Sequence, residues 1–241
     1  MRRSRTWRNP LWWTFSEPSE VRPAGSSRFI RSFCDALRAS LKEERALFDR
    51  VWALCAPGDW EPARSASIRN EWALDGGQRI DVLIRDKDTG RVLGIEVKTS
   101  RASAKAGQLE GYLQGLLNQR FREEDIAIAY LTPFNRDRAE KAIGAKAGLL
   151  PTVRVFEEFA RSFERARHVS WLDVADIEWD GGAIWRQHRS YVRERMACAK
   201  GLEVWLERNR GLDAFFSAEA VEDFLNELGP LIGDERSGVA G

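Results

Sequence analysis

Residues 79–85 and 92–99 both alternate between apolar and polar side chains, the period of a strand that is buried on one face. The segment between them, residues 86–90, contains two aspartates and ends in glycine, which predicts a turn. If residues 87–90 form the loop, the apolar side chains of the two strands face each other in three pairs, Ile80 with Val97, Val82 with Ile95, and Ile84 with Leu93. The pattern therefore predicts a β-hairpin with one apolar face.

The opposite face of this hairpin carries charged side chains. In the same register Asp81 lies directly across from Glu96, and Lys98 follows two residues later. Because side chains alternate along a strand, a slip of one residue would turn both carboxylates into the core. The hydrophobic pattern thus fixes the register, and the register brings the three charged groups together.

The rest of the pattern predicts further helices and strands. Apolar residues at helical spacing predict a helix that follows a cap at Ser26 or Ser27 and covers residues 29–41. The other expected elements are strands at 65–74, 126–132 and 153–156, and helices at 46–55, 105–119, 136–147, 157–166, 184–206 and after Ser217. Residues 168–180 are left open between one more strand and an irregular cover.

This order of elements is typical of an α/β protein with a mixed β-sheet flanked by helices. We expect four segments along the chain. They are an N-terminal arm with helices at 1–60, an α/β core at 61–167, a mainly helical extension at 168–233, and a disordered tail at 234–241.

The charged face of the hairpin has two interpretations. It is either a solvated strand face on which Lys98 neutralises the acids, or a binding site. Directly opposed like charges destabilise a sheet, so the pair Asp81 and Glu96 is better explained if a cation lies between them. Hard oxygen ligands of this kind suit Mg²⁺ or Mn²⁺.

Asp81 followed by Glu96-x-Lys98 on the next strand resembles the PD-(D/E)xK nuclease superfamily. The resemblance covers residues 68–133. Glu71 takes the place of the upstream acid of that superfamily, and Gln108 with Tyr112 resembles a Gln and Tyr pair on the helix after the core strands. The strand at 126–132, continued by a proline, is also similar, whereas Ile80 stands where the family name has proline.

The resemblance implies a restriction-endonuclease-like core and a role for each matched residue. Asp81, Glu96 and the carbonyl of Val97 would bind the metal ion, and Glu71 would complete the site directly, through water or at a second metal. Lys98 would orient the attacking water. Gln108 and Tyr112 are four residues apart, so both can reach the site from one helix face, although Tyr112 also belongs to an apolar stripe.

Composition limits the kind of partner and site. The formal net charge is only +1, so nucleic acid would be bound by local basic patches. Arg101 and Lys105 are the best placed; the other groups are Arg2, Arg3, Arg5 and Arg8, then Arg136, Arg138, Lys141 and Lys146, and finally Arg186, Arg189, Arg193 and Arg195. Three cysteines and two histidines are too few for an iron–sulfur or zinc site and fit a reducing cytoplasm. No apolar run is long enough to span a bilayer.

We therefore expect a Mg²⁺- or Mn²⁺-dependent deoxyribonuclease that acts on DNA. Three alternatives stay open: a catalytically inactive member of the same fold that binds nucleic acid or protein, a ribonuclease, and a helical interaction module whose hairpin is only structural. Bacterial defence, mobile-element or repair settings are suggested by analogy alone. A homodimer or a protein partner, and internal or terminal cleavage, are also left open.

Overall fold

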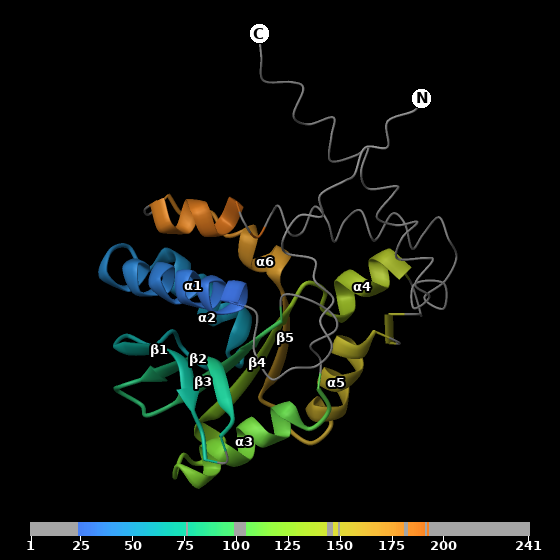
Figure 1. Ribbon diagram of the computed structural model, residues 1–241. Coiled ribbons are helices and arrows are strands. Elements are labelled where there is room, and N and C mark those ends of the chain that lie inside the picture. Colours follow the sequence, from blue (N-terminus) through green and yellow to red (C-terminus); the bar gives the residue numbers. More distant parts are fainter. Residues whose placement is uncertain are drawn as a thin grey trace, which may run out of the picture.

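A five-stranded mixed sheet forms the centre of the protein (Figure 1). The computed structural model describes residues 24–75, 77–98, 105–143, 147–148, 150–180, 183–190 and 192. The strands follow chain order across the sheet and are β1 (Ala66–Ala73), β2 (Arg79–Asp86), β3 (Val92–Val97), β4 (Ile126–Thr132) and β5 (Ala166–Ser170). The pairs β1–β2 and β2–β3 are antiparallel, whereas β3–β4 and β4–β5 are parallel. The expected α/β fold with a mixed sheet is confirmed.

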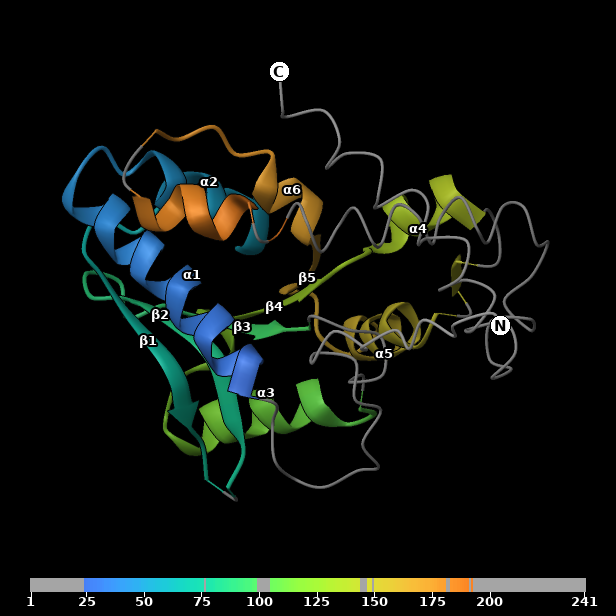
Figure 2. The same ribbon diagram turned by 45° about the horizontal axis from the view of Figure 1, so that its top comes forward.

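Helices cover both faces of the sheet (Figures 1 and 2). One face is covered by α1 (Ala24–Lys42), α2 (Ala46–Cys55) and α6 (Trp171–Ala175), and the other by α3 (Gln108–Asn118) and α5 (Pro151–Ala160). A short 3₁₀ turn, η2 (Glu123–Asp125), precedes β4, and α4 (Arg136–Ile143) follows it. None of the helices in the described ranges is both long and apolar enough to cross a membrane.

The register of the hairpin is confirmed over most of its length. Val82 pairs with Ile95 and Ile84 with Leu93, and all four side chains are buried under α1 and α2. The Asp86 amide donates to the Arg91 carbonyl at 2.9 Å, as a loop at residues 87–90 requires. The Asp86 carboxylate stabilises this loop by accepting hydrogen bonds from the amide of Asp88 and the hydroxyl of Thr89.

The third expected pair is wrong. Ile80 packs in the layer under α3, whereas Val97 packs in the layer under α1, so the two side chains do not face each other. The regular pairing of β2 and β3 ends at Val82 and Ile95. The two strands therefore stop forming a regular ladder at the position of Asp81 and Glu96.

The expected strand at 153–156 is also wrong, because these residues belong to α5. Two valines favoured a strand, but Pro151 stands at the first turn of the helix, where its missing N–H costs nothing. Thr152 and Phe159, seven residues or about two turns apart, are then both buried. The helix expected at 157–166 ends instead at Ala160.

Residues 166–170 form the fifth strand. The further strand that was one of two possibilities for residues 168–180 is therefore present, but it begins earlier and ends at Ser170. β5 crosses the boundary expected at residue 167, and the sheet continues beyond it. The helix expected after Ser26 begins slightly earlier, at Ala24. The arm expected before residue 24, the helices expected beyond residue 192 and the tail expected at 234–241 lie outside the described residues.

Candidate active site

Asp81 lies at the point where β2 and β3 stop pairing regularly. Extended by one residue, their register places Asp81 opposite Glu96. The Val97 amide, which faces β2, donates to Asp81 Oδ2 at 2.9 Å. The Asp81 carboxylate thus accepts the hydrogen bond that a strand carbonyl would otherwise accept at the end of the hairpin. This bond holds Asp81 beside the Glu96-x-Lys98 segment.

Glu96 accepts hydrogen bonds from three side chains. Its Oε1 lies 2.6 Å from Lys98 Nζ and 2.9 Å from Gln108 Nε2, and its Oε2 lies 2.7 Å from the hydroxyl of Tyr112. Lys98 Nζ also donates to Gln108 Oε1 at 2.8 Å. The structure therefore brings together four predicted residues, two from β3 and its end and two from α3.

Burial determines the electrostatics of this cluster. Asp81 and Glu96 are each 1% exposed and Lys98 is 5% exposed. Burial, reinforced by the charge of Asp81, raises the pKa of Glu96 to about 7, although Lys98 and Tyr112 act in the opposite direction. Burial and the Glu96 carboxylate raise the pKa of Tyr112, so its hydroxyl stays protonated and remains a donor.

The buried pair of acids provides a donor set that fits a divalent cation. Two carboxylates so close together in a desolvated place repel each other unless positive charge offsets them. The peptide group between Val97 and Lys98 adds a third oxygen. The Lys98 amide donates to the Leu131 carbonyl on β4 at 2.8 Å, and in a trans peptide the carbonyl points the opposite way. The Val97 carbonyl thus points toward β2, on the side of Asp81.

Glu71 is placed differently from the other predicted residues. It lies between the pairs Asn70–Val82 and Trp72–Ile80, which puts its backbone opposite Asp81. Its φ is 51°, in the left-handed region that a non-glycine residue rarely adopts. Within the described part of the chain, no three His, Cys, Asp or Glu side chains are close enough to hold a metal ion, so the Glu71 carboxylate is not gathered with Asp81 and Glu96.

The sequence model of the PD-(D/E)XK nuclease superfamily matches residues 12–180, which contain the whole sheet and every residue of this cluster. The chain belongs to the PD-(D/E)XK nuclease superfamily. This agrees with a mixed sheet covered by helices on both faces. Comparison with curated proteins found no match, and comparison with solved structures found none either.

Membership in the PD-(D/E)XK superfamily indicates nuclease chemistry on a nucleic-acid substrate. Enzymes of this superfamily generally use divalent metal ions, in agreement with the oxygen-rich donor set between β2 and β3. The three side chains that define the motif are nearly inaccessible here.

Sequence reasoning missed two polar residues that lie in the same row of the sheet as Glu96. Tyr130 pairs with Glu96 on one side and with His168 on the other, so they form one row with Asp81. The Tyr130 hydroxyl is buried and has no hydrogen-bond partner within the described ranges. Tyr130 is placed by the parallel pairing of β3 with β4, and His168 by that of β4 with β5. Local sequence patterns do not show which distant strands pair.

His168 is held in a single tautomer. Its Nε2 lies 2.8 Å from the Thr132 hydroxyl, which donates its own hydrogen to the Phe134 carbonyl at 2.6 Å. His168 must therefore donate from Nε2, and its Nδ1 carries a lone pair with no partner among the described residues. Burial lowers the pKa of His168 to about 3, so the ring stays neutral.

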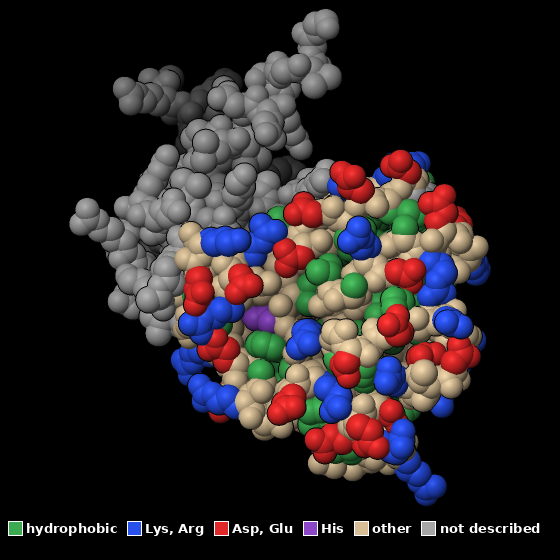
Figure 3. Space-filling view, turned by 180° about the vertical axis from the view of Figure 1, so that it is seen from behind, with side chains coloured by type: hydrophobic (Ala, Val, Ile, Leu, Met, Phe, Trp, Pro, Cys, Tyr) green, Lys and Arg blue, Asp and Glu red, His purple; other side chains and the backbone are tan. Residues whose placement is uncertain are grey.

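The expected basic patches are only partly open to a nucleic acid. Lys105 is exposed three residues before Gln108, whereas Arg101 lies outside the described residues. Arg136 pairs with Glu140 and Glu157, and Arg138 pairs with Asp173. Figure 3 shows acidic and basic side chains interspersed over the described part of the face behind the view of Figure 1. That face therefore offers no broad positive surface.

Proposed function

We propose that this protein is a metal-dependent nuclease that hydrolyses phosphodiester bonds in DNA. The observation that carries the proposal is the convergence of Asp81, Glu96 and Lys98 with Gln108 between β2, β3 and α3. A solvated strand face would leave these groups in water. Here they are buried and joined by hydrogen bonds, and the two acids face a single amine, that of Lys98, which pairs with Glu96.

Asp81, Glu96 and the Val97 carbonyl are the proposed metal ligands, and Glu71 would reach the ion through water. A bound Mg²⁺ or Mn²⁺ would polarise the phosphate and lower the pKa of a bound water. The protein supplies the positions of the ligands. The Val97 amide orients Asp81, and Tyr112 and Gln108 orient the two oxygens of Glu96.

Lys98 is proposed to orient the attacking water and to offset negative charge that develops on the phosphate. Its amine lies between Glu96 and Gln108, and it donates to Gln108 Oε1 at 2.8 Å. Gln108 therefore positions both the acid and the amine from one end of α3. Lys105 and Arg101, just before that helix, are the proposed contacts to the DNA backbone.

The test is cleavage of supercoiled and linear DNA with Mg²⁺, with Mn²⁺ or with a chelator, and of a labelled RNA of the same length. We expect metal-dependent cleavage of DNA that is lost in Asp81→Asn and in Lys98→Ala. Asp86→Asn is the matched control, because it changes a buried acid at the other end of the same strand. It should lower stability but keep the requirement for metal.

Cleavage that survives both active-site changes would sink the assignment. Preferential cleavage of the RNA would support phosphodiester hydrolysis but would show that the substrate is RNA and not DNA. Metal binding by the wild type without any cleavage would favour a catalytically inactive member of the superfamily. Binding is read from a metal-dependent rise in melting temperature that Asp81→Asn lacks.

A further inference from the structure

The carbonyl of Lys98 lacks the backbone partner that a parallel ladder would give it. In parallel pairing, a residue donates its N–H to one carbonyl of the next strand and accepts from the amide two residues further on. The Lys98 amide donates to the Leu131 carbonyl, so the amide expected at the Lys98 carbonyl is that of residue 133. Residue 133 is proline and has no N–H.

The indole of Trp171 supplies the missing hydrogen. Its Nε1 donates to the Lys98 carbonyl at 3.1 Å, across 73 residues of sequence. Trp171 is 1% exposed, so this bond is shielded from water. We infer that Trp171 is a positioning residue of the active site, which replaces the Pro133 amide and fixes the end of β3 that carries Lys98. This inference rests on the proposed nuclease function.

With the hydrogen bond from Trp171, the amide, the carbonyl and the amine of Lys98 all have partners. Its amide is held by β4, its carbonyl by α6, and its amine by Glu96 and by Gln108 of α3. The Val97 carbonyl, a proposed metal ligand, and the Lys98 amide belong to the same peptide group. A shift of the Lys98 backbone would therefore displace the amine and a metal ligand together.

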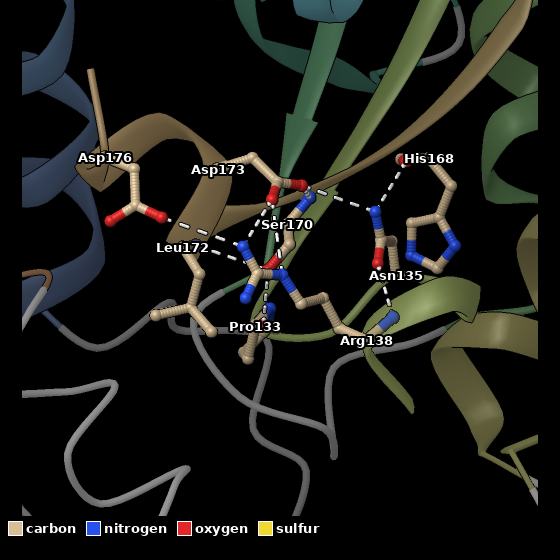
Figure 4. A network of polar contacts seen from close by, with 8 residues as sticks. All are labelled: Pro133, Asn135, Arg138, His168, Ser170, Leu172, Asp173 and Asp176. Atoms are coloured by element: carbon tan, nitrogen blue, oxygen red, sulfur yellow. Dashed lines mark hydrogen bonds and ion pairs between the residues drawn. The ribbon is translucent and has the colours of Figure 1, made fainter. Parts of the chain in front are cut away.

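Trp171 is itself held at the first position of α6. Ser170 caps this helix, since its hydroxyl accepts from the Leu172 amide, and Asp173 accepts from the Ser170 amide in return. The Ser170 hydroxyl also donates to the Pro133 carbonyl at 2.9 Å. Figure 4 shows this cap together with Arg138 of α4, which pairs with Asp173 at 2.9 Å.

Packing fixes the plane of the indole. The rings of Phe29 and Phe33 of α1 meet Trp171 edge to face, with centroids 4.8 and 5.3 Å away. The α1 rings thus hold the indole itself, while the cap at Ser170 holds the backbone that carries it. Its N–H is directed at a single acceptor, which is the arrangement a positioning residue requires.

The experiment compares Trp171→Phe with the double variant Trp171→Phe/Pro133→Ala. Trp171→Phe removes the indole donor and should lower kcat about tenfold with little change in KM, the effect of one lost hydrogen bond to a buried group. Pro133→Ala restores a backbone amide at the position that faces the Lys98 carbonyl. The double variant should therefore recover most of the lost kcat.

Trp185→Phe is the matched control, because the Trp185 Nε1 is buried without a partner among the described residues. It changes the same amount of aromatic surface but removes no hydrogen bond, and it should keep the wild-type kcat. Two results would overturn the inference: a Trp171→Phe variant as active as Trp185→Phe, or a double variant no more active than Trp171→Phe.

Hydrogen exchange of the Lys98 amide separates this inference from the proposed function. We expect faster exchange in Trp171→Phe and restored protection in the double variant, whether or not DNA is cleaved. If the wild type cleaves nothing, the nuclease proposal fails and the exchange data still decide the role of Trp171. If Trp171→Phe does not fold, the inference predicts that the double variant does, because it restores the lost hydrogen bond. A double variant that also fails to fold would refute the inference.

Discussion

The Glu96 carboxylate lies where three hydrogen-bond donors meet, although it is almost completely removed from solvent. Alternation of apolar and polar residues was enough to place it beside Asp81 and Lys98, because register follows from the pattern. The sequence could not show that Tyr130 lies next to Glu96, since that depends on a parallel pairing of strands distant in the chain. It also could not show the left-handed backbone of Glu71.

The raised pKa of Glu96, about 7, predicts how cleavage depends on pH. A protonated carboxyl is a poor metal ligand, so kcat/KM should fall as the pH drops below that value and level off above it. The Tyr112 hydrogen bond lowers the pKa of Glu96. In Tyr112→Phe the acidic limb of the profile should therefore move to higher pH.

The measurement is the pH dependence of kcat/KM for both proteins at Mg²⁺ concentrations well below saturation, because saturating metal would displace the proton from Glu96. Trp185→Phe, which does not touch the cluster, serves as the control for a general effect of a lost aromatic polar group. A limb that moves to lower pH in Tyr112→Phe would contradict the assignment of Glu96 as the titrating ligand.

At the scale of elements, the position of α3 decides whether Gln108 and Tyr112 reach the site. Two glycines lie on the side of α3 that approaches the strands. A Cβ at Gly115 would lie 3.0 Å from Leu74 Cβ and 2.9 Å from its Cδ1, whereas one at Gly111 would meet only the end of the Gln78 side chain. The helix was predicted from its apolar spacing, but nothing in that spacing indicates which glycine allows the close approach.

This difference predicts opposite effects of two alanine substitutions. Gly115→Ala should lower the unfolding free energy by about 1–2 kcal/mol, because Leu74 is buried and cannot yield. Gly111→Ala should leave it unchanged or raise it by up to about 1 kcal/mol, because the exposed Gln78 side chain can move away and alanine favours the helix. Both values come from chemical denaturation.

Each of these two variants serves as the control for the other, since they share the helix and the substitution. Gly115→Ala should also slow DNA cleavage, because it displaces Gln108 and Tyr112 from Glu96. Equal stability of the two variants would show that α3 does not need its close contact with Leu74.

At the scale of the whole molecule, two apolar layers enclose the sheet, and His188 is buried beside the one that contains α1. His188 is 2% exposed and lies among the rings of Phe29, Phe33 and Trp185. The burial of His188 depends on a helical segment at 183–190 that returns to α1, which no local pattern reports.

Burial lowers the pKa of His188 from 6.5 to about 4 in the folded protein. Between these two values the unfolded chain binds the proton and the folded chain does not, so stability is lost as the pH falls. The expected loss is about 3 kcal/mol, complete near pH 4. His188→Phe, which keeps an aromatic ring in place, should show a smaller loss.

This effect is measured by urea denaturation of the wild type and of His188→Phe at a series of pH values between 4 and 7. The difference between their unfolding free energies removes the contribution of the acids that both proteins share. Parallel curves would mean that His188 is solvated or charged in the folded state.

The hydrogen bond from Trp171 to Lys98 joins residues 73 positions apart. Translation delivers the chain from its N-terminus, so both acidic strands leave the ribosome long before the tryptophan does. A nascent polypeptide that has reached only β4 carries every metal ligand we propose but leaves the Lys98 carbonyl without its donor. Competence to cut DNA is therefore expected to arise late in synthesis, once the fifth strand has been released.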